Sequence, residues 1–411
     1  MWAVRRACRH GGAYPGAVIP APAIDVLTVA TVRAPDPADL LALLPEHGAL
    51  AWVHEGDGLV GWGEAARVEL SGPDRFADAQ RWWRSVVADA DVTDEVRLPG
   101  TGLVAFGSFA FDPAAGSSVL VVPEVVVGRR AGTAWVTTVG TAAARLPVRR
   151  APRPPGVVRF ADGARTSLEW VRVVAGAVQR IEAGEVSKVV LARDVEARTQ
   201  DPLDVRWPLR RLAHGYPACW TFAVATSRVL AGTLRRSGDA TMDVRKGTAL
   251  ARSIKDVEEH GYGVRSVADA LALHCSTVDV PVDPFVLELP NVMHLATDVT
   301  GVVADGATSL ELIASLHPPA AVCGTPTEVA MDMIREVEGL DRGRYAGPVG
   351  WLNAAGDGEW GIALRCGQVD PDDPRRLRLF AGCGIVEGSK PADELAESNA
   401  KLVPMRDALG S

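Results

Sequence analysis

The spacing of apolar residues changes near residue 165, and this change restricts the possible folds most strongly. Between residues 25 and 145, short apolar runs alternate with turn residues, as in 49–54, Gly56-Asp57-Gly58 and 59–63. This alternation is typical of β-hairpins, and one helix-like stretch at about 73–89 interrupts it. Beyond residue 165, long helical patterns and strand-like runs follow one another without strict β-α-β alternation. The whole pattern predicts an α+β fold.

Helix and strand signals are clearest in the second half of the chain. Thr166 and Glu169 have the spacing of a capping box, and apolar residues at 168, 171, 174, 178 and 181 predict a helix that Gly184 ends. Residues 188–193 read as a buried strand, and a long helix is expected over about 248–274. Further strands are expected near 346–351, 359–366 and 377–386, and a final helix from 389–391 onward.

The 411 residues suffice for one large domain with a sizeable core. We expect a loose N-terminal extension over 1–24 and a single domain over 25–411. Within it, 25–145 is β-rich, 146–165 is an Arg/Pro-rich connection and 166–409 is the catalytic portion. Prolines at 15, 20 and 22 argue against a signal peptide, and no run approaches the roughly 18 apolar residues of a membrane span.

Charge and cysteine usage restrict the partners and the compartment. The formal net charge of −8 argues against a nucleic-acid partner, because such proteins carry a basic surface. The six cysteines form no C-x-x-C pair and have no zinc-like spacing to histidine. We therefore expect no membrane association, a cytoplasmic protein with reduced thiols, and cysteines that serve mainly as small buried apolar residues.

Only five of the 43 basic residues are lysines, and the first of them is Lys188. Codon bias towards arginine explains the scarcity in general. A lysine can nevertheless act as a base, whereas arginine is effectively never deprotonated. Lys188 begins a predicted strand, where it is either an exposed strand-end residue or a desolvated one with an altered pKa. The sequence leaves both readings open.

Two predicted helices carry acidic residues three positions apart, Asp256 with Glu259 and Glu394 with Glu397. This spacing places each pair on one helix face, and two such faces together could hold Mg²⁺. Ordinary solvated acidic faces explain the same pattern. Glu397 is also placed to form an ion pair with Lys401, one helical turn later.

Other segments have the composition of an anion site. Gly382 and Gly384 belong to a glycine-rich turn that could offer backbone N–H groups to a ligand. Arg365 lies inside the apolar strand 361–366, where its guanidinium needs a partner: a substrate carboxylate or a structural ion pair. His294 and His317 are read as core imidazoles on local context alone.

These segments, taken in order, resemble the chorismate-utilising enzymes, and most closely the isochorismate synthases of menaquinone or siderophore biosynthesis. The resemblance extends over 166–409, with a further likeness at 61–65. Its motifs lie at 188–193, 230–233, 255–260, 294–297, 317–318, 321–326, 345–351, 365–366 and 380–386, and in the helix with Glu394, Glu397 and Lys401.

The resemblance implies an anthranilate-synthase component I-like fold, with large antiparallel sheets packed against helices. It also implies an enzyme that interconverts chorismate and isochorismate with Mg²⁺, water attacking C2 as the C4 hydroxyl leaves. We expect a monomer. Lys188 matches the general base. The metal residues are Glu259, Glu397, Asp256 and Glu394. The residues around the substrate are His294, Gly324, Thr325, Tyr345, Arg365, Gly382, Gly384 and Lys401.

One departure from the family pattern affects catalysis. The family carries its general acid, a glutamate, in a hairpin before the L-A-G-T segment, but here 221–230 runs directly into Ala231-Gly232-Thr233. A positioned general acid contributes about 10²–10⁴-fold in rate, so we expect reduced turnover. The alternatives are a salicylate synthase, which would go on to eliminate pyruvate, and an inactive paralogue that only binds chorismate or a partner.

Overall fold

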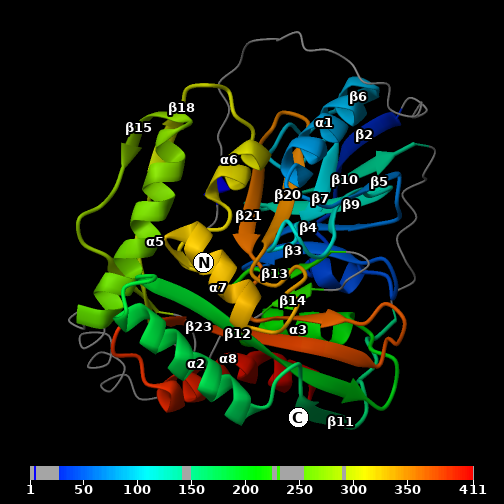
Figure 1. Cartoon of the computed structure of the whole chain (residues 1–411). Helices are drawn as coiled ribbons and strands as arrows, with labels where there is room; N and C mark the ends of the chain where they lie inside the picture. The colour runs from blue at the N-terminus through cyan, green and yellow to red at the C-terminus, as the bar shows by residue number, and fades with distance from the viewer. Residues whose placement is uncertain are drawn as a thin grey trace.

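Three large sheets carry most of the strands of the α+β fold that the sequence predicts (Figure 1). The structure is a computed structural model that describes residues 4–5, 27–140, 150–224, 229–231, 254–288 and 293–410. It describes no side chains for 4–5, 229–231, 254–259, 287–288 and 293–294. Among the described strands every pairing is antiparallel except that of β2 with β6.

Two of the sheets are built mainly from the first part of the chain. One has the order β1 (Val4–Arg5), β21 (Gly358–Ile362), β20 (Pro348–Asn353), β7 (Val104–Ser108), β8 (Ser118–Val122) and β5 (Ala66–Leu70). The other has the order β13 (Thr221–Ala223), β3 (Leu50–His54), β4 (Asp57–Trp62), β9 (Val125–Arg130), β10 (Thr133–Val139), β2 (Leu27–Ala34) and β6 (Ala90–Asp94). Because β13, β20 and β21 come from later residues, the N-terminal and catalytic portions share both sheets.

The third sheet holds the strand that begins at Lys188. Its order is β11 (Val158–Asp162), β12 (Lys188–Thr199), β23 (Arg376–Ile385), β22 (Cys366–Val369) and β14 (Val229–Ala231), and β19 (Gly324–Thr325) pairs with the start of β12. β11 lies within the predicted connection 146–165 and pairs with β12. β1 lies within the predicted extension 1–24 and pairs with β21.

Helices cover the third sheet on both sides. In Figure 1, α2 (Ser167–Glu182) and α8 (Pro391–Leu409) lie side by side below β12 and β23, and α7 (Thr327–Val337) lies above β12. The other described helices are η1 (Leu40–Leu43), α1 (Arg75–Ala88), α3 (Arg206–Gly215), α5 (Ile254–Ala272) and α6 (Ser309–Leu316). None of the described helices combines the length and apolar composition needed to cross a membrane.

Local sequence accounts well for α2. Thr166 and Glu169 form the predicted capping box, with the Thr166 N–H donating to Glu169 Oε2 at 2.8 Å. The buried face agrees with the expected one in part: Val174 and Ile181 are buried as predicted, whereas Leu168 is exposed. Trp170 and Ala177 are buried in addition. The indole N–H of Trp170 donates to the Ala192 carbonyl at 3.1 Å, which fastens α2 to β12.

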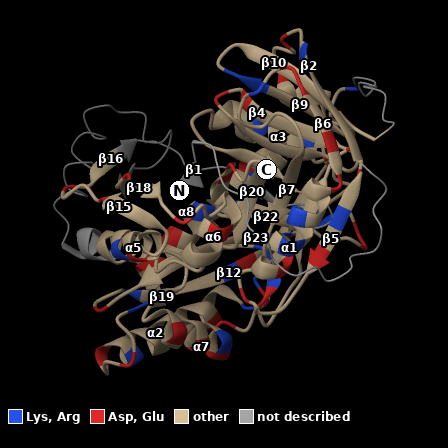
Figure 2. Ribbon diagram, turned by 90° about the horizontal axis from the view of Figure 1, so that it is seen from above, with Lys and Arg blue, Asp and Glu red and all other residues tan. Residues whose placement is uncertain are grey.

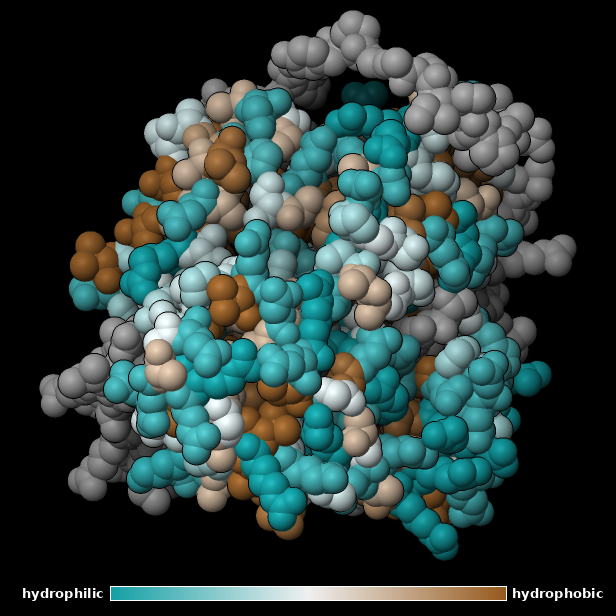
Figure 3. Space-filling view, viewed as in Figure 1, coloured by the Kyte–Doolittle hydropathy of each residue, from teal (hydrophilic) through white to brown (hydrophobic). Residues whose placement is uncertain are grey.

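Two short sheets beside α5 form a small lobe: β15 (Cys275–Asp279) with β18 (Thr300–Val303), which lies at the upper left of Figure 1, and β16 (Phe285–Glu288) with β17 (Met293–Ala296). Exposed apolar side chains gather on this lobe in Figure 3, among them Leu273, Val282 and Val302.

Basic and acidic residues are intermingled over the described ribbon in Figure 2. No disulfide joins any two of the five described cysteines, and four of them are buried as expected.

Candidate active site

Lys188 is the first residue of β12, and its side chain is only 1% exposed. The reading of an exposed strand-end lysine is therefore wrong. Lys188 lies opposite Thr325 of β19, and the neighbouring Ser187 N–H donates to the Thr325 carbonyl at 2.9 Å. A buried ammonium group is costly unless it is hydrogen-bonded or paired, so its burial here indicates a polar site. This is the environment that a lysine base requires.

Gly324 brings β19 close to the start of β12. Its φ of +143° lies in the region that favours glycine, and a Cβ there would lie 2.1 Å from the Lys188 carbonyl oxygen and 2.6 Å from Ala330 Cβ. Only glycine fits this close approach of two backbones. The structure thus brings three predicted site residues, Lys188, Gly324 and Thr325, together at one edge of the sheet.

Gly382 and Gly384 lie within β23, so the strand expected near 377–386 is confirmed and the expected glycine-rich turn is wrong. Gly384 is paired with Val190 and Gly382 with Ala192, and both glycines therefore lie beside the strand of Lys188. A Cβ on Gly382 would lie 3.0 Å from the Tyr345 hydroxyl oxygen, so the absent side chain leaves room for that hydroxyl.

Tyr345 is buried against β23. Its ring stacks on Phe380 with centroids 5.0 Å apart, and burial raises the pKa of its phenol above the usual value. The hydroxyl therefore stays protonated at neutral pH and can donate a hydrogen bond to a ligand oxygen. This arrangement is consistent with the predicted position of Tyr345 beside the substrate.

Arg365 lies in the turn between β21 and β22, with a φ of +53°, and not inside a strand as predicted. Burial lowers the pKa of its guanidinium, which the nearby Tyr345 and Glu397 partly oppose. Within the described part of the chain, Arg365 forms no hydrogen bond or ion pair. A half-buried cation in this state suits an incoming carboxylate, and the alternative of a structural ion pair is not supported by the described contacts.

The helix α8 brings acidic residues to the same region. Glu394 is buried, whereas the Glu397 side chain is about half exposed and forms the expected ion pair with Lys401. The Lys401 ammonium also donates to the Gly382 carbonyl at 2.8 Å, so it fastens α8 to β23. The i,i+4 ion pair is therefore part of a larger contact between the helix and the sheet.

These carboxylates could contribute to a cation site. Single ligand atoms of Glu394, Glu397 and Cys383 all lie within 4.8 Å of one another. Carboxylate oxygens fit a hard cation such as Mg²⁺, whereas a thiol does not. Burial raises the pKa of Cys383 to about 12, so the thiol is a neutral neighbour, with Sγ 3.3 Å from the Glu394 carbonyl oxygen. The two carboxylates of α8 thus fit the ion that the sequence predicts.

Three predicted site residues are described only by their backbone. Asp256 and Glu259 lie in α5, three positions apart as predicted, and His294 lies in β17 opposite Leu287. Their side chains lie outside the described residues, so their proposed roles stay predictions. His317 is half-buried, with Nε2 3.0 Å from the Phe111 carbonyl oxygen.

Sequence reasoning missed a polar cluster behind the base strand. Arg342 donates to Glu338 and to the carbonyl oxygens of Val190 and Val322, and Glu338 accepts from the Ala192 N–H. The only available signal was the i,i+4 spacing of Glu338 and Arg342, which is also common on exposed helix faces. Sequence reasoning also gave Arg193 no role beyond its place in the motif 188–193, although its side chain contacts both α2 and α8.

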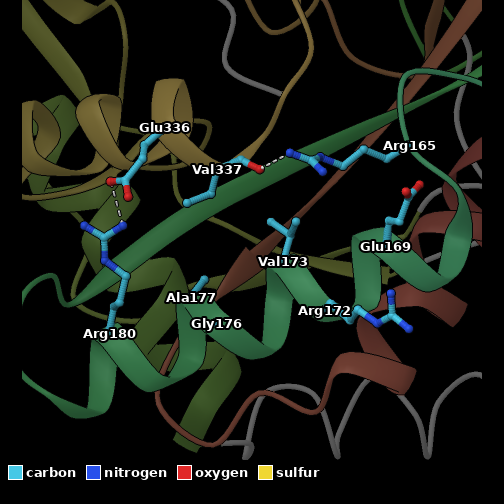
Figure 4. A pocket seen from close by; sticks show the side chains of 9 residues that line it. All are labelled: Arg165, Glu169, Arg172, Val173, Gly176, Ala177, Arg180, Glu336 and Val337. Atoms are coloured by element: carbon cyan, nitrogen blue, oxygen red, sulfur yellow. Dashed lines mark hydrogen bonds and ion pairs between the residues drawn. The ribbon is translucent and has the colours of Figure 1, made fainter.

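Two surface hollows lie away from these residues. An open groove of about 460 Å³ lies between α2 and the end of α7, where Arg165 donates to the Val337 carbonyl and Arg180 pairs with Glu336 (Figure 4). A second hollow of about 360 Å³ lies between η1, β3 and α3. Neither is lined by a predicted site residue.

The segment expected to lack the general acid lies where the chain passes from one sheet to another. β13 pairs with β3 in one sheet, whereas β14 pairs with β22 in another. Residues 225–228 between them lie outside the described residues. The prediction that a hairpin is missing here rests on sequence alone.

Comparisons with known proteins agree with this description. The family model described as chorismate binding enzyme matches residues 27–151, 149–229 and 225–410, and its last two stretches meet at 225–229. Isochorismate synthase DhbC of Bacillus subtilis is 38% identical over 261 residues, which cover 56% of this chain and 65% of that protein. The salicylate biosynthesis isochorismate synthase of Pseudomonas aeruginosa is 32% identical, covering 98% of this chain and 95% of that protein.

Solved structures confirm the predicted fold. MenF, the menaquinone-specific isochorismate synthase of Escherichia coli, is similar with a TM-score of 0.78 at 23% identity, covering 94% of this chain and 96% of its own. Anthranilate synthase component I of Streptococcus pneumoniae is similar with a TM-score of 0.67 at 18% identity, covering 84% of this chain and 91% of its own. The α+β fold is therefore of the anthranilate-synthase component I type.

Proposed function

Because this chain belongs to the family of chorismate-binding enzymes, we propose that it is an isochorismate synthase that interconverts chorismate and isochorismate. The observation that carries the proposal is the full burial of Lys188 beside β19 and the glycines of β23. In the proposed reaction, water adds to C2 of the ring and the C4 hydroxyl leaves. The names of isochorismate synthase MenF of Bacillus subtilis and of the vibriobactin-specific isochorismate synthase of Vibrio cholerae support menaquinone or siderophore biosynthesis as the pathway.

Lys188 would act as the base that removes a proton from the attacking water. A lysine can lose its proton and take up another, which an arginine in the same place effectively cannot. Burial excludes bulk water from the side chain, so the group that accepts the proton is held in one place. Its amine would take the water proton as the new bond to C2 forms.

The substrate carboxylates would be held by Arg365 and Tyr345. Arg365 offers a half-buried guanidinium, and Tyr345 offers a protonated hydroxyl. The family resemblance also implies that Gly324, Thr325, His294, Gly382, Gly384 and Lys401 surround the substrate. Among these residues, Lys401 is held in place by the Gly382 carbonyl.

The metal residues would be Glu259 and Glu397, with Asp256 and Glu394 close by. A bound Mg²⁺ would neutralise a substrate carboxylate and orient it towards the base. The closeness of Glu394 and Glu397 on α8 supports the proposal for these two residues. We expect that exchanging Glu397 for glutamine weakens Mg²⁺ binding, so that turnover requires a higher Mg²⁺ concentration.

We further propose that turnover is slow because no positioned acid protonates the leaving hydroxyl. Typical turnover numbers are about 10 s⁻¹, and a missing general acid costs about 10²–10⁴-fold, which gives about 10⁻¹ to 10⁻³ s⁻¹. An external acid such as acetic acid would then accelerate the reaction in proportion to its concentration. A rate of 10 s⁻¹ or more, with no response to added acid, would contradict this part of the proposal.

The deciding experiment incubates the full chain with chorismate, with and without Mg²⁺, and separates the products by chromatography. We expect isochorismate in the presence of Mg²⁺ and none from Lys188→Met. Lys390→Met is the matched control, because Lys390 is an exposed lysine at the start of α8. Salicylate with pyruvate would indicate a salicylate synthase instead. Tight chorismate binding without product, unchanged by Lys188→Ala, would indicate an inactive paralogue.

A further inference from the structure

Arg193 joins the strand that begins at Lys188 to the helix that carries Glu394 and Glu397. It lies five residues after Lys188 in β12, opposite Ala381 of β23. One terminal nitrogen of its guanidinium, Nη1, donates to Ser398 Oγ at 3.2 Å and to Asn399 Oδ1 at 3.0 Å, both in α8.

A second contact of the same guanidinium reaches α2. Arg193 Nη2 donates to Ser167 Oγ at 3.3 Å, in the first turn of that helix. The two helices lie side by side below β12 and β23 in Figure 1. One side chain therefore spans a strand and both helices that support it.

The cost of burying this guanidinium suggests a role beyond packing. Arg193 is 3% exposed, and its Nε has no hydrogen-bond partner within the described residues. All three acceptors that it contacts are neutral side chains, and burial lowers its pKa. An apolar side chain of similar size usually stabilises a packed core at least as well as a buried charged group does.

The contacts in α8 lie next to the predicted metal residue Glu397. Ser398 and Asn399 follow it directly, and Ser398 is fully buried. The Ser398 hydroxyl accepts from Arg193 and donates to the Leu395 carbonyl at 2.8 Å, so it is held from both sides. These bonds determine how far α8 can rotate about its axis, and with it the directions of Glu394 and Glu397.

We propose that Arg193 is a positioning residue that sets the rotation of α8 so that Glu394 and Glu397 face the metal. It touches neither the substrate nor the ion. This inference rests on the proposed function, because that function assigns the metal to these carboxylates. Residues that orient metal ligands typically change metal affinity by about 10–100-fold when they are removed.

Arginine is needed for this role because one planar group must reach three acceptors in two helices. A lysine carries a single nitrogen on a flexible stem, and it is more strongly hydrated. Arg193→Lys should therefore keep the charge but restore only part of the positioning. Arg193→Gln should lose both.

The test measures Mn²⁺ binding to the full chain by electron paramagnetic resonance, without substrate. We expect Arg193→Gln to raise the dissociation constant of Mn²⁺ about 10–100-fold, and Arg193→Lys to lie between it and the wild type. Arg75→Gln is the matched control, because Arg75 in α1 is also buried, bonds only neutral carbonyl groups and has an orphaned Nε. It should leave Mn²⁺ binding unchanged.

A milder variant keeps the test decisive if Arg193→Gln does not fold. Asn399 is exposed, so Asn399→Ala should fold and remove one acceptor, with an expected loss of about fivefold in Mn²⁺ affinity. In a folded Arg193→Gln background, Asn399→Ala should add little, because the two residues act through one bond.

The outcomes separate this inference from the proposed function. If the wild type binds Mn²⁺ and both variants, Asn399→Ala and Arg193→Gln, bind it with the same affinity as the wild type, the metal site stands but Arg193 has no positioning role. If the wild type binds no Mn²⁺, the metal assignment and this inference fall together. An equal loss in Arg75→Gln would point to a general effect of removing a buried arginine and would overturn the inference.

Discussion

Arg342 and Glu338 form a buried ion pair that holds the strand of Lys188 from behind. The guanidinium contacts both carboxylate oxygens at 2.7 Å, and the two side chains are 3% and 1% exposed. Arg342 also donates to the Val190 carbonyl at 2.7 Å, and its guanidinium lies 4.2 Å from the ring centroid of Phe111. The pair thus connects the end of α7 to the backbone of β12.

Removing one partner of this pair should be strongly destabilising. Glu338→Gln leaves the Arg342 charge buried without its counter-ion, and we expect a loss of about 3–5 kcal/mol in the free energy of unfolding. Urea unfolding would measure it. Glu196→Ala is the control, because its ion pair with Arg376 is largely exposed and should contribute less than about 1 kcal/mol. Equal losses of unfolding free energy in the two variants would show that burial does not make the Arg342–Glu338 pair more important than an exposed pair.

His317 should make the fold sensitive to acid. Burial lowers the pKa of its imidazole from 6.5 to about 3, so the folded protein keeps it neutral where the unfolded chain binds a proton. Its contribution to stability is therefore complete above pH 6.5 and is lost as the pH falls from 6.5 towards 3. Between pH 7 and pH 5 this loss is about 2 kcal/mol.

The variant His317→Gln tests this effect, since its amide can still donate to the Phe111 carbonyl but does not titrate. The free energy of unfolding should fall less steeply between pH 7 and pH 5 than in the wild type, by about 2 kcal/mol. Parallel pH profiles for the two proteins would show that His317 does not carry the effect.

Gly324→Ala should distort the site as well as the fold. The new Cβ would meet the Lys188 carbonyl in a conformation that side chains rarely adopt, which we expect to cost about 2–5 kcal/mol. The unfolding free energy and chorismate turnover should both fall. Gly176→Ala is the matched control in the middle of α2, where nothing lies within 4 Å of the added Cβ. It should stabilise the protein by about 0.5–1 kcal/mol, and a stability loss there as large as that at Gly324 would contradict this account.

Arg365→Gln should act mainly on substrate binding. A charge-assisted hydrogen bond contributes about 1.5–3 kcal/mol, so the KM for chorismate should rise about 10–150-fold with a smaller change in kcat. Steady-state kinetics would measure this, with Arg198→Gln, a change of an exposed arginine in β12, as the control. An unchanged KM would remove Arg365 from the substrate site.

Much of the local structure could be predicted from the sequence. The capping box of α2, the hairpin of β3 and β4, the start of α8 and the strand at Lys188 all follow from neighbouring residues. Such signals depend on hydrogen bonds and periodicity within a few residues, which the sequence displays directly. The order of the motifs also sufficed to predict the fold and the family.

Other features were decided by contacts between distant segments. The burial of Lys188 depends on β19, more than 130 residues later, and the place of Gly382 beside the strand of Lys188 depends on the pairing of β23 with β12. The turn at Arg365 and the pairing of β11 likewise arise from neighbours far away in the chain.

The sequence by itself therefore determined which residues could carry the chemistry. The tertiary structure decided which of them are buried, paired and close together. The physical reason is that burial and strand register depend on contacts with side chains and backbones of distant segments. The local sequence pattern does not show which distant segments make these contacts.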